Sequence, residues 1–148
     1  MKKVYKRIVA VLLLVCVIAG TFGVSKSIDA SSKSARYFAY LFGPNNKYKN
    51  TENVKSFKFK GKKVIITASL KKAKDDTAYY SNKVTNLKMK KRTFKLASNC
   101  KFYAGGGEDG LSKVSKKDFL GYVKLYNGLG LVFYTNKSGK IVKMVIKC

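Results

Sequence analysis

The chain has 148 residues, 46% of them apolar and 13% aromatic, which suits one domain with a packed core and excludes a mostly disordered chain. Lysine and arginine number 32 against 7 aspartate and glutamate residues, a formal net charge of +25 at pH 7. The chain has no histidine, which excludes histidine acid–base catalysis, Cys–His nucleophile pairs and zinc sites with imidazole ligands.

Residues 1–30 predict a secretory signal peptide. The opening MKKVYKR is basic, residues 8–24 form an apolar run, and small residues follow. Ala30 is the preferred cleavage point, with Gly20 and Gly23 as alternatives. An uncleaved anchor is the competing interpretation, although the run is short for the roughly 20 residues that span a bilayer. We therefore expect a secreted protein, or one on the extracellular face of the envelope, with membrane contact through this segment alone.

Residues 31–53 are expected to form an N-terminal arm packed on a β-barrel domain of residues 54–148. The stretch from Ala35 to Phe42 is aromatic and fits either a helix or an edge strand. Gly43-Pro44-Asn45 then marks a turn. The sequence therefore leaves the secondary structure of the arm undecided.

Alternating apolar and polar residues predict three strands between residues 54 and 104. VKSFKFKG places Phe57 and Phe59 on one face and lysines on the other, and Gly61 makes a turn. KKVIITASL follows as a strand rich in β-branched residues. A long third strand begins with VTNLKMKK, and its alternation shifts between Met89 and Phe94, which suggests a β-bulge.

Gly105 to Gly110 spell G-x-G-x-x-G, the spacing of dinucleotide-binding loops. Here Glu108 and Asp109 would repel a phosphate, no acid follows near position 130 for the ribose, and too little chain remains for a doubly wound sheet. We expect a flexible turn with both acids in water. A weak Ca²⁺ site at these acids is the lesser alternative, because they supply few ligands. No cofactor or metal is therefore expected.

The segment VSKKDFLGYVKLYNG predicts the one clear helix. Ser115 and Asp118 have capping-box spacing, and Gly128 stands where a C-cap glycine would. The residues at helical spacing, which would share its buried face, are Phe119, Tyr122, Val123 and Tyr126. LGLVFYTN and KIVKMVIK then predict two strands joined by a turn at residues 136–139.

This order of elements indicates a mainly β fold with one helix, a small five-stranded OB-like barrel. An α+β sheet with one packed helix, or another small barrel, fits nearly as well. In the OB arrangement the third and fifth strands run parallel, so Cys100 and Cys148 are expected near strand ends that meet. We predict a disulfide between them in an exported protein, with two free thiols as the alternative.

Two stretches within residues 90–148 carry a resemblance: KKRTFKLASNCKFYAGGG and DFLGYVKLYNGLGLVFYTNKSGKIVKMVIKC. They resemble small exported, mostly uncharacterised proteins of Gram-positive bacteria, which have lysine-rich β-domains and closing hairpins. The resemblance implies a small exported β-domain and transfers no functional residue.

The remaining pattern favours binding over catalysis, and we do not expect an enzyme. Asp75-Asp76 and Glu108-Asp109 are sequence neighbours in loops, typical of solvated turns rather than of a catalytic carboxylate pair. Aromatic residues beside lysines suit stacking on bases or sugars while the lysines attract a charged backbone. The candidate binding residues in or next to loops are Tyr79, Tyr80, Tyr103, Lys71, Lys72 and Lys101.

The charge itself predicts the partner. Only Arg7, Arg36 and Arg92 are arginines, and a lysine-rich surface suits diffuse attraction to polyanions more than precise recognition. We predict a module that associates with an anionic polymer at the cell surface, such as teichoic acid, acidic glycan or extracellular nucleic acid. The alternatives are a protein-interaction or structural module that docks an envelope protein, and a charge that serves only solubility.

Overall fold

The computed structural model describes residues 34–48 and 50–148. The predicted signal peptide, its cleavage points and its anchor alternative lie outside these residues. Within the described chain the elements are β1 (Ala35–Tyr40), β2 (Val54–Lys60), β3 (Lys63–Ala73), α2 (Asp76–Tyr80), β4 (Thr85–Gly105), η1 (Gly107–Asp109), β5 (Leu111–Val114), α3 (Lys116–Lys124), β6 (Gly130–Thr135) and β7 (Ile141–Lys147). No helix in this part of the chain is long and apolar enough to cross a membrane.

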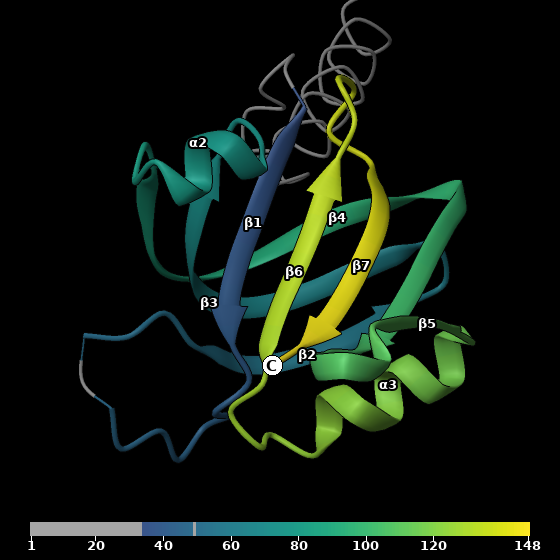
Figure 1. The fold of residues 1–148 in the computed structure, drawn as a ribbon, viewed down its shortest axis with the longest axis horizontal. Helices are drawn as coiled ribbons and strands as arrows, with labels where there is room; N and C mark the ends of the chain where they lie inside the picture. Colours follow the sequence, from purple (N-terminus) through teal and green to yellow (C-terminus); the bar gives the residue numbers. More distant parts are fainter. Residues whose placement is uncertain (1–33, 49) are drawn as a thin grey trace, which may run out of the picture.

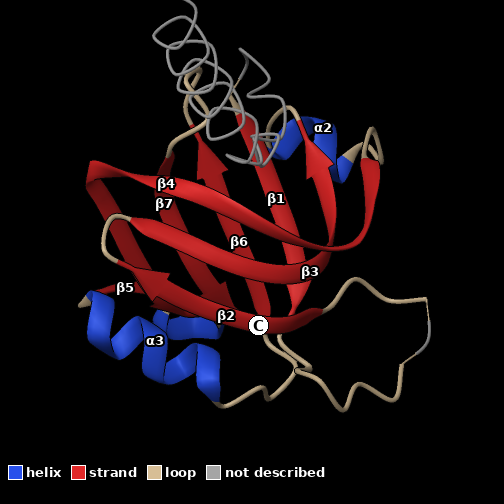
Figure 2. Cartoon of the chain, turned by 180° about the vertical axis from the view of Figure 1, so that it is seen from behind, coloured by secondary structure: helices blue, strands red, loops and turns tan. Residues whose placement is uncertain are grey.

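The strands form one sheet in the order β2-β3-β1-β6-β7-β4-β5, and β3 also pairs with β4. This additional pairing closes a ring of five strands: β1, β3, β4, β7 and β6. Figure 1 shows β1, β6 and β7 on one side of the ring, and Figure 2, from behind, shows β2, β3 and β4 on the other. The prediction of a mainly β fold with one substantial helix is confirmed.

The predicted parallel pair is also present, but the ring uses a different first strand. β4 and β7, the expected third and fifth strands, run parallel with Phe102 opposite Met144. β2, expected to be the first strand, pairs with β3 alone and extends the ring. β1 takes its place, antiparallel to both β3 and β6.

β1 is therefore neither a helix nor an edge strand, the two alternatives that its sequence left open. Its residues ARYFAY are buried up to Ala39 and half-buried at Tyr40. Tyr37 belongs to the core inside the ring, whereas Phe38 packs in a smaller cluster on the outside. A strand covered on both faces lacks the alternation of apolar and polar residues that identifies a strand in a sequence.

The β-bulge predicted between Met89 and Phe94 is present slightly earlier in β4, between Leu87 and Lys90, where β4 pairs with β3. Lys90 lies opposite Ala68, but Leu87 lies opposite Leu70, so the register shifts in between. Arg92, which is 7% exposed, donates to the carbonyl oxygens of Ala68 at 2.7 Å, Lys88 at 2.8 Å and Lys90 at 3.2 Å. The guanidinium group therefore satisfies three backbone acceptors at the irregular point of the ring.

α3 lies across one end of the ring (Figure 2). Its predicted start is confirmed, because Ser115 Oγ accepts a hydrogen bond from the Asp118 amide at 3.1 Å. Phe119 and Val123 are fully buried, and the ring centroid of Phe119 lies 5.3 Å from that of Phe102. These two side chains fix the helix to the sheet.

The predicted end of α3 and part of its buried face are wrong. The helix ends at Lys124 with Leu125 as its C-cap, before Gly128. Tyr126 already has a left-handed backbone, with φ 44°. Tyr122, expected in the core, is 42% exposed, since a helix lying on the rim of the ring buries a narrow stripe of its surface.

The glycine-rich stretch is a turn, as predicted. Gly107–Asp109 form a single 3₁₀ turn between β4 and β5, which are antiparallel neighbours. Gly105 has φ 132°, and a Cβ there would lie 2.5 Å from the carbonyl oxygen of Gly110. The glycines therefore allow the backbone to approach itself closely in a tight hairpin.

Candidate functional site

The outward side of β2, β3 and the first half of β4 carries lysines in a regular pattern. Lys60 pairs with Lys63, and Lys63 pairs with Lys95, so three lysines stand directly opposite one another on adjacent strands. Lys58 and Lys91 lie on the same side, because their β3 partners Ile65 and Thr67 alternate with the inward residues. All five lysines are exposed. We call Lys58, Lys60, Lys63, Lys91 and Lys95 the lysine face.

The charge of the lysine face is not offset by acids on the strands that carry it. β2, β3 and β4 contain neither aspartate nor glutamate. Directly opposed residues have Cβ atoms about 5 Å apart, where like charges destabilise a sheet. The Cβ atoms are thus closer together than the Debye length of roughly 8 Å at physiological salt, and the ammonium groups that they carry repel one another unless the side chains diverge. An anionic ligand that neutralises the lysine face would relieve this repulsion.

The other side of the ring is rich in aromatic residues. The outward residues Arg36, Tyr134, Lys143 and Lys101 follow one another across β1, β6, β7 and β4. In the next row Phe38, Val132, Val145 and Tyr103 do the same. We call these two rows, with Tyr40 and the α2 tyrosines, the aromatic side.

Four of the six candidate binding residues meet on the aromatic side. The centroid of the Tyr79 ring lies 3.6 Å from Arg36 Cζ, and the neighbouring Tyr80 is 70% exposed. Lys143 Nζ lies 5.3 Å from the centroid of the Tyr103 ring, and Lys101 stands opposite Lys143. The structure thus brings Tyr79, Tyr80, Tyr103 and Lys101 to one side of the ring.

The other two candidates, Lys71 and Lys72, do not act as a pair. Successive residues of a strand point to opposite faces. Lys71 stands opposite Phe38 and forms an ion pair with Glu52 at 3.5 Å. Lys72 Nζ lies 5.9 Å from the centroid of the Tyr37 ring. Neither lysine belongs to the lysine face.

Arg36 also belongs to the aromatic side, although the sequence patterns did not select it as a candidate binding residue. Its side chain is 1% exposed, and Nε donates to Asp76 Oδ1 at 2.6 Å. Asp76 also accepts a hydrogen bond from the Tyr134 hydroxyl at 3.0 Å. Burial, together with this hydrogen bond, raises the pKa of Tyr134, so its hydroxyl stays a donor. The one feature of the sequence that could have identified Arg36 is its position as an arginine inside an apolar run.

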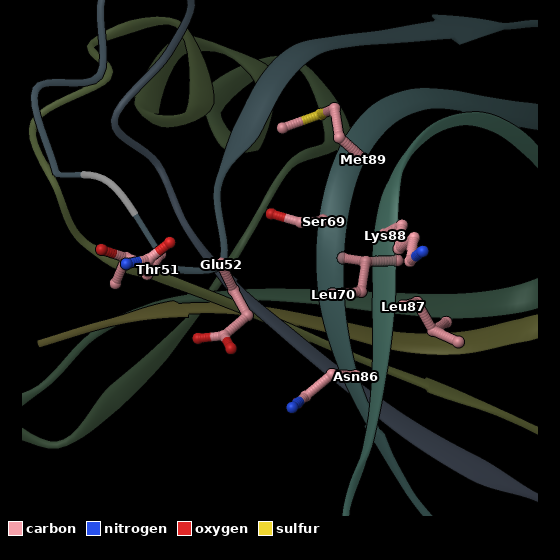
Figure 3. Close-up of a pocket in the computed structure, with 9 residues that line it drawn as sticks. Thr51, Glu52, Ser69, Leu70, Asn86, Leu87, Lys88 and Met89 are labelled. Atoms are coloured by element: carbon pink, nitrogen blue, oxygen red, sulfur yellow. The ribbon is translucent and has the colours of Figure 1, made fainter.

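A hollow of about 570 Å³ lies between residues 50–52, β3 and the start of β4 (Figure 3). Its polar lining includes Glu52, Ser69 and Asn86. Glu52 is the one acid among the lining residues, and it is already paired with Lys71. A carboxylate-pair hydrolase needs a second acid facing the first, which this lining lacks. None of the six candidate binding residues lines this hollow.

The predicted disulfide between Cys100 and Cys148 is not formed, and both are free thiols. The parallel pairing of their strands is right, but β4 continues beyond Cys100 to Gly105. Lys101 stands opposite Lys143, which puts Cys148 roughly six residues, or about 20 Å, farther along the pair than Cys100. Cys148 instead lies beside Gly106.

Cys100 is expected to be a slow nucleophile. Burial raises the pKa of its thiol to about 11, a rise that the nearby Lys116 ammonium opposes. At pH 8 we therefore expect iodoacetamide to alkylate Cys100 about 100-fold more slowly than free cysteine, with the rate rising about tenfold per pH unit up to pH 10. Mass spectrometry of the Cys100 peptide measures this rate. A pH-independent rate, or one equal to that of free cysteine, would contradict the expected pKa.

Comparisons with family models, curated proteins and solved structures find no match to this chain. Across residues 34–48 and 50–148, no three His, Cys, Asp or Glu side chains gather as a metal site. The assignment of a function therefore depends on the two sides of the ring.

Proposed function

We propose that this protein is an exported, non-catalytic module that binds anionic polymers at the cell surface through the lysine face. The polymer carries closely spaced phosphate or carboxylate groups, as teichoic acid, acidic glycan and nucleic acid do. The mechanism is counterion release: each lysine that neutralises a ligand charge frees a condensed cation from the polymer. Export follows from the leading segment and from the resemblance to small Gram-positive exported β-domain proteins.

The observation that carries the proposal is the row of Lys60, Lys63 and Lys95. These residues come from three strands, and the fold holds their like charges together although the arrangement costs stability. The charge is therefore arranged on the surface as well as abundant in the composition. A polyanion lying across the strands would meet three ammonium groups in succession.

The topology of the ring supports the same site. We propose that the five strands form an OB-like barrel, in which β1, β3, β4, β6 and β7 take the places of the first to fifth strands. The antiparallel and parallel pairings agree with that order, and α3 lies between the third and fourth strands. OB barrels bind oligonucleotides and oligosaccharides across their second and third strands. Here these strands are β3 and β4, which carry part of the lysine face.

The docking alternative has weaker support in the distribution of apolar side chains. A protein-interaction site usually has a contiguous apolar patch. The exposed large hydrophobic residues of the described chain lie on five different segments: Tyr48, Tyr80, Met89, Leu111, Tyr122 and Leu125. The aromatic side is interrupted by charged residues. Binding of a polyanion therefore explains the distribution of charged and apolar side chains on the surface better than docking of a protein does.

Fluorescence anisotropy with a labelled oligothymidylate, a phosphate polymer without base pairing, tests the proposal. The triple variant Lys60→Gln, Lys63→Gln, Lys95→Gln is expected to bind at least about tenfold more weakly at ~0.1 M salt. The plot of log affinity against log salt is expected to lose about 2 from its slope, since each lost contact to a single strand removes roughly 0.7. The full chain serves for both measurements.

The matched control is Lys83→Gln, Lys117→Gln, Lys124→Gln, which removes the same charge from exposed positions outside the lysine face. We expect this control to change the slope by less than about 1. Equal losses in both triple variants would show a diffuse field without a site. Binding that survives ~1 M salt would contradict the electrostatic mechanism itself.

A further inference from the structure

The aromatic side contains a small hollow of about 250 Å³ beside Arg36. Its walls are the side chains of Phe38 and Tyr40 from β1 and of Tyr79 and Tyr80 from α2. Lys147 of β7 lies at its rim, where its Nζ is 3.4 Å from the Tyr80 hydroxyl. The hollow is thus bounded by aromatic rings and by two cations.

A glycine fixes the position of one wall of the hollow. Gly130 of β6 stands between Tyr40 and Lys147 in the sheet register, and it lines the hollow. A Cβ at Gly130 would lie 2.9 Å from Cε2 of Phe38. Any larger residue would push the Phe38 ring out of its place. Gly130 therefore makes room for the Phe38 ring, which forms one wall of the hollow.

Arg36 gives the hollow its chemistry. Nε is occupied by Asp76, but Nη1 is buried and has no hydrogen-bond partner among the described residues. Buried donors are nearly always paired, so an unpaired guanidinium nitrogen calls for a specific explanation. A guanidinium group matches the planar geometry of carboxylate and phosphate oxygens. An oxyanion is the ligand that fits this nitrogen.

The aromatic walls and the size of the hollow define the rest of the ligand. The hollow is smaller than the roughly 300 Å³ at which pockets for drug-sized molecules begin, so it suits one ring. Tyr80 is 70% exposed and is therefore free to turn and stack on such a ring. Its side-chain contacts include the Tyr79 ring, at 5.5 Å between centroids, and Lys147.

We propose that this hollow binds a single sugar ring that bears a carboxylate or phosphate group. Tyr80 turns outward and stacks on the ring, and the acid group then reaches Arg36 Nη1 and Lys147 Nζ. This site lies on the other side of the ring of strands from the lysine face. It recognises one residue of defined chemistry, whereas the lysine face responds to charge density, and it does not depend on the proposed function.

NMR titration of the full chain with glucuronic acid, glucose 6-phosphate and glucose tests the proposal. We expect at least one acidic sugar to shift the amide resonances of Tyr80, Gly130 and Lys147 in a saturable way. Glucose, the neutral match, is expected to bind about tenfold more weakly, because it offers no partner to the two cations. Equal binding of glucose would overturn the proposal. The comparison of the two acidic sugars identifies which acid group the site takes.

The variants Tyr80→Ser and Lys147→Gln are expected to weaken binding of the acidic sugar about tenfold. Their matched controls are Tyr48→Ser, at a tyrosine of similar exposure in the loop before β2, and Lys124→Gln on α3, and both are expected to leave binding unchanged. Loss of binding in the controls as well would overturn the proposal.

The variant Lys60→Gln, Lys63→Gln, Lys95→Gln separates this proposal from the proposed function. It is expected to keep full binding of the acidic sugar while losing the oligothymidylate. If it loses the sugar as well, the sugar binds at the lysine face and the hollow is not its site, although the proposed function then still stands.

Discussion

Replacing Arg92 by methionine is expected to destabilise the protein by about 3 kcal/mol. The guanidinium group bonds three carbonyl oxygens at the bulge between β3 and β4, and the one on Ala68 is buried. Methionine fills a similar volume but leaves these acceptors without their donor, and the carbonyl of Ala68 is then unpaired away from water. Urea unfolding followed by circular dichroism measures the change in the free energy of unfolding.

Two variants separate the hydrogen bonds of Arg92 from its charge. Lys91→Met removes the same charge from the exposed neighbouring position and is expected to change stability by less than about 0.5 kcal/mol. Arg92→Lys keeps the charge but lacks the planar fork, so we expect a loss of about 2 kcal/mol. If Arg92→Met is no more harmful than Lys91→Met, the three hydrogen bonds contribute nothing.

The variant Phe119→Ala is expected to cost about 4 kcal/mol. Phe119 is fully buried, and its ring centroid lies 5.3 Å from that of Phe102 and 6.4 Å from that of Phe57. Truncation leaves a cavity at the end of the ring of strands that α3 covers, and the side chains of Phe57 and Phe102 both lose a packing partner. The same urea unfolding experiment measures the loss.

Tyr122→Ala is the matched control for Phe119→Ala, because it truncates an aromatic residue on the same helix. Tyr122 is 42% exposed, so its loss is expected to cost less than about 1 kcal/mol. Equal losses in the two variants would mean that α3 is not held to the sheet through Phe119.

The sequence predicts those parts of the fold that have one face in the core and the other in water. Phe57 alternates with exposed neighbours in β2, and Ser115 has the spacing of a helix cap, so local patterns identify both. β1 has no such pattern because it is covered on both faces. The place of β1 in the ring depends on its pairing with β3 and β6, which lie far from it in the sequence.

The candidate site was less predictable for a similar reason. Sequence patterns place the lysines of β2 and β4 on the outside, but the register between strands decides which of them stand opposite one another. Lys60 and Lys63 face each other across the Gly61 turn, whereas Lys95 is some thirty positions away and joins them through the β3–β4 register alone. Arg36 and Asp76 likewise meet only in the folded chain.

The lysines of β2 have a further consequence for how copies of this protein meet. β2 pairs with one strand of the described sheet, and its other edge offers unsatisfied backbone donors and acceptors. A second molecule adding its own β2 there would bring Lys58 and Lys60 beside their equivalents. Mutual repulsion opposes this edge-to-edge stacking, so the same lysines protect the exposed edge of the sheet against fibre growth.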